Sequence, residues 1–112
     1  MGKGTFLGEF EQMVLLAILR LQDNAYGVHV RRVIEERAGR LVTIGALYAA
    51  LERLERKRFL TSRETAPEPI RGGRAKRVYT VTTMGTRALS HSQAMMRNMA
   101  EGLALDSERP GA

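Results

Sequence analysis

The sequence contains no cysteine and no tryptophan, and only 3 of its 112 residues are proline. Without cysteine, the chain can form neither a disulfide nor a thiolate metal site, and a cysteine nucleophile is excluded. No apolar run approaches the roughly 18 residues that a membrane-spanning helix needs, and the first residues lack the apolar stretch of a signal peptide. These absences predict a cytoplasmic protein without a membrane partner.

Residues suited to catalysis or metal binding are also scarce. The two histidines, His29 and His91, lie far apart in the sequence, and neither has a second ligand at helical spacing. The sequence therefore predicts neither an enzyme nor a protein that needs a metal or another cofactor. We interpret the paired acids as solvated faces of helices and not as acid/base pairs; they are Glu9 with Glu11 and Glu35 with Glu36.

Positive charge is in excess, because 18 lysines and arginines stand against 12 acidic residues, which gives a net charge of +6. A charge of this sign favours a polyanionic partner, either nucleic acid or an anionic membrane face. A chain of 112 residues is expected to fold as one domain, and its 44% hydrophobic content is enough for a small core.

Apolar residues in the first part of the chain follow a helical repeat. They recur at steps of three and four residues, which predicts a helix from about Leu7 to Gln22 with one face in the core. A second apolar stripe lies on another side of this helix, and a domain this small can hardly cover both sides. We therefore expect a partner chain to contact the second stripe, which consists of Leu15, Leu16 and Leu19.

The next two predicted helices are joined by a short connection. A second helix is expected from Ala25 to Ala38, with Gly39 as its left-handed C-terminal residue. Residues 40–42 then form an extended link to Thr43, whose hydroxyl can cap the N-terminus of a third helix. Two helices, a tight connection and a third helix together indicate a helix-turn-helix.

The third helix carries small residues and arginines on the side opposite its expected core residues, which are Ile44, Leu47, Leu51 and Leu54. On its own this pattern also fits a solvated amphipathic helix, but the major groove of duplex DNA would accept such a helix. Tyr48 lies at the edge of the exposed side, where its hydroxyl could reach a phosphate or belong to the core. Arg53 is a long-reach cation for a guanine edge or a phosphate. The candidate DNA-binding residues of this helix are Thr43, Gly45, Ala46, Tyr48, Ala49 and Arg53.

A β-hairpin is predicted directly after the third helix. Residues 59–65 and 77–82 are rich in aromatic, β-branched and threonine residues, as strands are. The two prolines and paired glycines between them indicate the tip of a hairpin. We interpret this basic tip as a wing that contacts the phosphate backbone or the minor groove; a solvated hairpin tip is the alternative. The candidate wing residues are Arg71, Gly72, Gly73, Arg74, Lys76 and Arg77.

A last helix is predicted from about Met84 to Leu105, with Thr83 as its cap. Its apolar residues alternate steps of three and four, which is typical of a short dimerisation seam. Met95, Met96 and Met99 could also line a pocket for a small-molecule effector, although methionines at this spacing more often belong to a plain core. We expect a homodimer, and the candidate interface residues are Leu15, Leu16, Leu19, Leu89, Met96, Met99 and Leu103.

Four blocks follow one another along the chain: LGEFEQMVLLAIL, AYGVHVRRVIEERAGR, TIGALYAALERLERK and RGGRAKRVYTVTTMG. In order and spacing, from about Leu7 to Leu89, they resemble the PadR-like family of winged helix-turn-helix transcriptional regulators. The resemblance implies a homodimeric DNA-binding repressor, often responsive to a small molecule bound near the dimer interface. Arg58 departs from the pattern, because similar sequences usually carry glycine there. If this position needs a left-handed backbone, arginine is unfavourable; otherwise it adds a cation close to the DNA.

The predicted fold is mainly α with a small β-hairpin, namely a winged helix-turn-helix followed by a long C-terminal dimerisation helix. We expect residues 1–82 to form the DNA-binding domain, residues 83–105 the dimerisation helix, and residues 106–112 a disordered tail. The predicted function is sequence-specific binding of double-stranded DNA by a homodimeric regulator, most simply a repressor. The alternative is a winged-helix module for protein contacts with only non-specific affinity for DNA.

Overall fold

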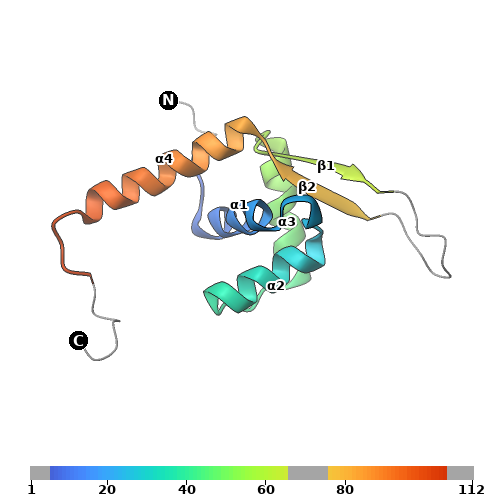
Figure 1. Ribbon diagram of the computed structural model, residues 1–112, viewed down its shortest axis with the longest axis horizontal. Helices are drawn as coiled ribbons and strands as arrows, with labels where there is room; N and C mark the ends of the chain where they lie inside the picture. Colours follow the sequence, from blue (N-terminus) through green and yellow to red (C-terminus); the bar gives the residue numbers. More distant parts are fainter. Residues whose placement is uncertain (1–5, 66–75, 106–112) are drawn as a thin grey trace.

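The computed structural model describes residues 6–65 and 76–105 of the chain, and the fold is mainly helical (Figure 1). Three helices form the body, a two-stranded hairpin extends from one side, and the last helix runs away on the other side (Figure 1). The elements are α1 (Glu9–Leu21), the 3-10 turn η2 (Gln22–Asn24), α2 (Gly27–Ala38), α3 (Ile44–Arg56), β1 (Leu60–Glu64), β2 (Arg77–Val81) and α4 (Thr83–Ala100).

The core lies where α1, α2 and α3 meet the base of the hairpin. Leu47, Leu51 and Leu54 of α3 are fully buried, because their three- and four-residue spacing places them on one face. Val14 and Ile18 of α1 pack in the same core cluster. The prediction that Ile44 belongs to this face is wrong, since its side chain lies at the first turn of α3 and is 51% exposed.

The signals that begin and end the helices of the body are mostly where the sequence places them. Thr43 is the N-cap of α3, and its Oγ1 accepts a hydrogen bond of 3.1 Å from the Ala46 amide. Gly39 ends α2 with a φ of 64°, the left-handed conformation that glycine adopts at low cost. However, α2 begins at Gly27 and not at Ala25, because Tyr26 is extended and forms an isolated bridge with Val78.

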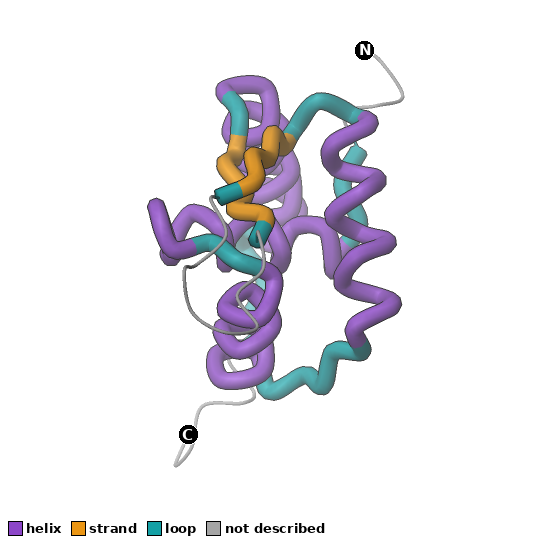
Figure 2. The backbone as a smooth tube through the Cα atoms, turned by 90° about the vertical axis from the view of Figure 1, so that its right-hand side faces the viewer, coloured by secondary structure: helices purple, strands orange, loops and turns teal. Residues whose placement is uncertain are grey.

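The two strands pair antiparallel, with Leu60 opposite Val81 and Glu64 opposite Arg77. Both strands are one or two residues shorter than predicted, at 60–64 and 77–81. Figure 2 shows that β1 joins the end of α3 and that β2 leads into α4, so the hairpin base connects the two helices. The predicted wing tip with Arg71, Gly72, Gly73 and Arg74 lies outside the described residues.

The last helix differs from its prediction at both ends. Its cap is Thr82 and not Thr83, since Thr82 Oγ1 accepts a hydrogen bond of 3.0 Å from the Gly85 amide. It ends at Ala100, five residues before the predicted Leu105, and is followed by Gly102 with a φ of 84°. Leu103 therefore lies beyond the helix, and the predicted seam does not continue to it.

Two residues of the predicted dimer interface are already covered by the chain itself. Leu15 is 0% exposed and Leu89 is 5% exposed, and both belong to the core cluster. The prediction is therefore wrong for these two residues, because a side chain inside the subunit cannot contact a partner. The remaining interface candidates are exposed: Leu16 and Leu19 on α1, Met96 and Met99 on α4, and Leu103.

Candidate nucleic-acid interface

The first turns of α3 expose only small or apolar side chains. Thr43, Gly45, Ala46 and Ala49 all lie at the surface. A Cβ atom added at Gly45 would meet no atom of residues 6–65 and 76–105 within 4 Å, so these residues leave the space in front of the backbone open. In Figure 2, α3 lies along the outer side of the molecule. Another macromolecule can therefore approach the α3 backbone closely here.

Tyr48 lies beside these residues and connects them to the start of α2. The residue is 44% exposed, so it is not a core tyrosine. A Cβ atom added at Gly27 would lie 2.5 Å from the Tyr48 hydroxyl, which means that only glycine allows this approach. The hydroxyl is thereby placed next to the first turn of α2, where backbone amides have no acceptor within the helix.

Arg53, the cation predicted to reach the DNA, is held against α1. Its Nε lies 3.4 Å from Oε2 of Glu11. Lys57 Nζ lies 3.0 Å from the same oxygen and 3.2 Å from Oε1. The Gly8 amide donates a hydrogen bond of 2.9 Å to Oε1. The end of α3 is thus joined to the start of α1 by one carboxylate with three donors.

Glu11 itself is only 6% exposed. Burial raises the pKa of its carboxyl, but hydrogen bonds from Gly8, Lys57 and Arg53 together with the Lys57 charge outweigh burial and leave the pKa below its ordinary value. The interpretation of Glu11 as part of a solvated face is therefore wrong. A sequence signal was present, since Glu11 lies on the stripe of Val14, Leu15 and Ile18 and three residues after the N-cap, Gly8.

The other acidic pair also includes a residue with a structural contact. Glu35 is half-buried; its Oε2 accepts a hydrogen bond of 3.2 Å from the Val42 amide and lies 3.4 Å from Arg31 Nε. This carboxylate holds the connection between α2 and α3, which sets where the exposed turns of α3 begin. Glu9 and Glu36 are exposed as predicted.

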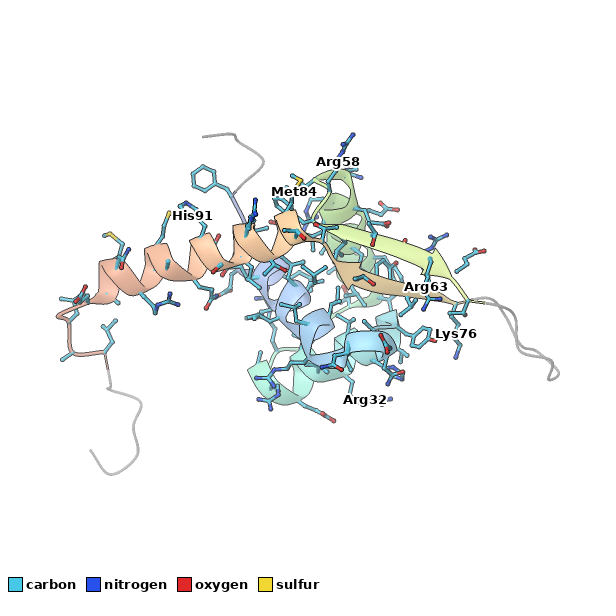
Figure 3. The ribbon with its side chains drawn as sticks, turned by 45° about the horizontal axis from the view of Figure 1, so that its top comes forward. Arg32, Arg58, Arg63, Lys76, Met84 and His91 are labelled. Atoms are coloured by element: carbon cyan, nitrogen blue, oxygen red, sulfur yellow. The ribbon has the colours of Figure 1, made fainter. Side chains whose placement is uncertain are left out.

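Arg58 occupies the turn between α3 and β1 with a φ of 67°. This answers the question raised by the missing glycine, because the position does require the left-handed backbone that arginine adopts only at a cost. The Arg58 carbonyl accepts a hydrogen bond of 2.7 Å from the Thr82 hydroxyl, which fixes the turn to the start of α4. The side chain points outward from the end of α3 (Figure 3).

The base of the hairpin carries the two wing candidates that the structure describes. The Lys76 ammonium lies 5.9 Å from the centre of the Tyr26 ring, a cation–π arrangement. Arg77 donates a hydrogen bond of 3.0 Å to the Ser62 hydroxyl, and its guanidinium lies 3.6 Å from the Glu64 carboxylate. Both side chains are exposed, and Lys76 lies at the end of the hairpin that is remote from α4 (Figure 3).

Other kinds of site are not found in the described part of the chain. Residues 6–65 and 76–105 contain no group of three or more histidines and acids that could hold a metal ion. None of their helices is long and apolar enough to cross a membrane. An open groove lies between α1 and α2 and has a volume of 210 Å³. It is lined by Met13, Leu16, Ala17, Arg20, Val33, Ile34, Arg37 and Ala38.

Solved structures of transcription regulators share this fold. A PadR family transcription regulator from Clostridium difficile R20291 is 28% identical, with a TM-score of 0.65, and the match covers 80% of this chain and 90% of that one. A PadR family transcriptional regulator from Eggerthella lenta is 24% identical, with a TM-score of 0.66 and coverages of 84% and 81%. No curated protein matches the sequence.

The model of the transcriptional regulator PadR-like family matches residues 15–91. The match includes most of α1, all of α2 and α3, the hairpin and the first half of α4. These are the elements that build the exposed turns of α3 and the base of the wing. The chain therefore belongs to the PadR-like family of transcriptional regulators.

Proposed function

We propose that the protein is a sequence-specific DNA-binding repressor that acts as a homodimer. The observation that carries the proposal is the open, small-residue surface at the first turns of α3, the third helix of a helix-turn-helix. In such motifs the N-terminal part of this helix enters the major groove. Gly45, Ala46 and Ala49 are exposed there, and no atom of the described residues lies within 4 Å of a Cβ added at Gly45.

In this proposal some residues around α3 contact the bases of the DNA and others contact its phosphate backbone. Thr43 and the small residues reach base edges, since they allow the helix backbone to come close. The Tyr48 hydroxyl, beside the first turn of α2, meets a phosphate, because hydroxyl donors and helix N-termini both bind phosphate oxygens. These phosphate contacts set the position of α3 on the duplex without choosing a sequence.

The wing adds affinity with little base preference. Lys76 and Arg77 stand at its base, and the tip residues Arg71 and Arg74 with the glycine pair 72–73 complete it in this proposal. Cations that neutralise phosphates release counterions, so each contact should increase the dependence of binding on salt by about 0.9 logarithmic units. Replacing Arg74 and Arg77 with alanine should therefore weaken binding to every duplex.

A homodimer would present two copies of α3 to two half-sites about 34 Å apart, or a multiple of that spacing. The surfaces available for pairing are Leu16 and Leu19 on α1 and the exposed methionines at the far end of α4. Met96 is 66% exposed and Met99 is 77% exposed in the single chain. Apolar side chains so exposed along one helix support a partner surface of the same kind on a second copy.

We also propose that a small-molecule effector binds near the interface between subunits. The groove between α1 and α2 supports this, because Leu16 belongs both to its lining and to the proposed pairing surface. A molecule in the groove would contact α1 and α2 together and could shift the spacing of the two α3 helices. Operator titration with and without candidate effectors tests this part of the proposal separately.

The experiment that tests the main proposal is a graded substitution at Gly45. Operator fragments are first selected from a random duplex pool with the unaltered protein. Gly45→Ala and Gly45→Leu should both fold at least as well as the parent, because a Cβ added there meets no described atom within 4 Å and glycine inside a helix costs about 1 kcal/mol relative to alanine. Gly45→Leu should nevertheless abolish operator binding, while Gly45→Ala reduces it less.

Normal operator binding by a folded Gly45→Leu variant would show that this face of α3 does not enter the groove. A protein that selects no sequence from the pool, and whose weak binding is the same for all duplexes, would instead be a winged-helix module for protein contacts. The slope of binding against salt distinguishes these cases further, since only phosphate neutralisation makes it steep.

A further inference from the structure

The cations near the end of α3 fall into two groups. Arg53 and Lys57 both contact the Glu11 carboxylate, at 3.4 and 3.0 Å. Arg56 and Arg58 form no ion pair within residues 6–65 and 76–105, and both are exposed. One acid from α1 therefore contacts two cations at the end of α3 and offsets one of their two charges, whereas Arg56 and Arg58 have no acidic partner among the described residues.

The Glu11 contact is unlike an ordinary surface ion pair. The Glu11 side chain is 8% exposed, whereas Arg53 and Lys57 are 44% and 28% exposed. A buried carboxylate needs its donors, because a charge without partners in this position would be strongly unfavourable. Arg53 and Lys57 are thus held by a buried carboxylate, although their own side chains are partly exposed at the surface.

From this geometry we propose that Glu11 is a positioning residue for DNA recognition: it holds Arg53 and Lys57 off the phosphate backbone and fixes α3 to α1. The inference rests on the proposed DNA-binding function and assigns Arg53 a different role from a direct DNA contact. It predicts that two potential phosphate contacts are withheld, so that sequence-independent affinity is kept low relative to operator affinity.

The physical reason is that phosphate contacts and base contacts respond differently to free cations. A cation released near the backbone strengthens binding to any duplex, because it displaces counterions regardless of sequence. It adds nothing to the difference between the operator and other sequences. The contact of Lys57 Nζ with the Phe6 carbonyl at 3.2 Å further ties the end of α3 to the segment before α1, so losing Glu11 would also loosen the placement of α3.

The test replaces Glu11 with glutamine, which keeps the size of the side chain and an acceptor for the Gly8 amide but removes the charge. Binding to the selected operator and to a random duplex is measured between about 50 and 200 mM salt. For the random duplex, the salt slope should become steeper by about one to two units. The ratio between the affinity for the operator and the affinity for a random duplex should fall by about tenfold, which is similar to the loss of affinity caused by one mismatched base pair in a site.

The matched control is Glu36→Gln on α2. It changes the net charge by the same amount, but Glu36 is exposed and forms no ion pair within the described residues, so no cation is released. The control should leave both the slope and the affinity ratio close to those of the parent. A purely structural role for Glu11 predicts a different result, namely lower stability with an unchanged salt slope for the folded fraction.

A second variant keeps the proposal testable if Glu11→Gln does not fold. Arg53→Gln in the parent should leave the salt slope unchanged, because the contact with Glu11 already holds Arg53 off the phosphate backbone. If Arg53 instead contacted a phosphate directly, the substitution should lower the slope by about 0.9 units. An unchanged slope in folded Glu11→Gln, or a lower slope in Arg53→Gln, overturns the inference and leaves the DNA-binding proposal intact. If the parent protein binds no duplex in a salt-dependent way, both proposals fail together.

Discussion

The two halves of α4 have similar apolar spacing but different surroundings. In the part up to Gln93, Ala88, Leu89 and Ser92 are buried against the body, and Gln93 donates a hydrogen bond of 2.8 Å to Gln12 of α1. In the second half, Met95, Met96 and Met99 are exposed and the helix extends away from the other elements (Figure 1). The chain itself thus covers the apolar face of α4 in one half only.

This contrast separates the surfaces that hold one chain together from those available to another. Apolar residues at helical spacing indicate only that one face of a helix is apolar, and do not indicate whether the same chain or another chain covers that face. An isolated helix of this length is marginal in water, so the far half of α4 needs contacts that the described part of the chain does not supply. The proposed homodimer would provide them, and the predictions below test the two halves against each other.

The largest effect is expected from charge in the far half. Changing Met96 and Met99 to glutamate places like charges across the proposed two-fold axis, where they would be buried together. The protein should become monomeric, and operator affinity should fall by orders of magnitude because each half must then bind alone. Sedimentation at micromolar concentration and operator titration measure both effects. An unaltered chain that is monomeric and still binds one half-site tightly would contradict the dimer.

The next largest effect concerns the core of the body. Leu54→Ala removes a fully buried side chain of α3 and should lower the free energy of unfolding by about 2–5 kcal/mol. This loss should appear at every protein concentration. Met99→Ala, by contrast, should destabilise the protein only at concentrations where dimers form. Denaturant unfolding at several protein concentrations compares the two variants. If their loss of stability depended on protein concentration to the same extent, the proposed difference between the core and the far half of α4 would be contradicted.

A smaller effect is expected at the turn that joins α3 to the hairpin. Arg58→Gly should raise the free energy of unfolding by about 1 kcal/mol, since glycine adopts the observed φ of 67° without steric cost. The matched control is Arg56→Gly, two residues earlier at the last residue of α3, which should lower stability by at most about 1 kcal/mol. Thermal unfolding of both variants measures the shifts, and a loss of stability in both would mean that the turn does not favour glycine.

The smallest effect is a loss of stability in acid that depends on Glu11. Its pKa is below the ordinary value of 4.5 in the folded chain, so the ionised form is favoured by folding. The stabilisation is complete above about pH 5 and is lost as the pH falls through the lowered pKa. Burial offsets part of the gain, which keeps the effect modest. The free energy of unfolding should be measured between about pH 3 and pH 7, the range that covers the titration of carboxyl groups. It should fall less steeply with decreasing pH in Glu11→Gln than in the parent.

The sequence predicted the elements because their signals are local. The caps at Thr43 and Gly39, the strand composition and the helical periodicity each involve residues that are close in the chain, and all but the extent of α4 and a few boundaries agree with the structure. The candidate surface on α3 could be predicted for the same reason. Opposite faces of one helix follow from spacing alone.

What the sequence did not decide is which neighbour each side chain meets. Leu15 and Leu16 are adjacent apolar residues of α1, yet one is in the core and the other is exposed. Glu11 and Arg53 are 42 residues apart, and no local pattern pairs them. Such contacts arise from the angles at which the helices pack, and those angles depend on side chains of several elements at once.

The sequence by itself therefore determined a winged helix-turn-helix with a net positive charge, because periodicity, capping and turn residues are properties of short segments. Only the tertiary structure decided that Arg53 is paired with a buried acid, that Arg58 occupies a left-handed turn, and that Leu15 and Leu89 are unavailable to a partner. The physical reason is that burial and charge pairing depend on distances between segments that are remote in the chain.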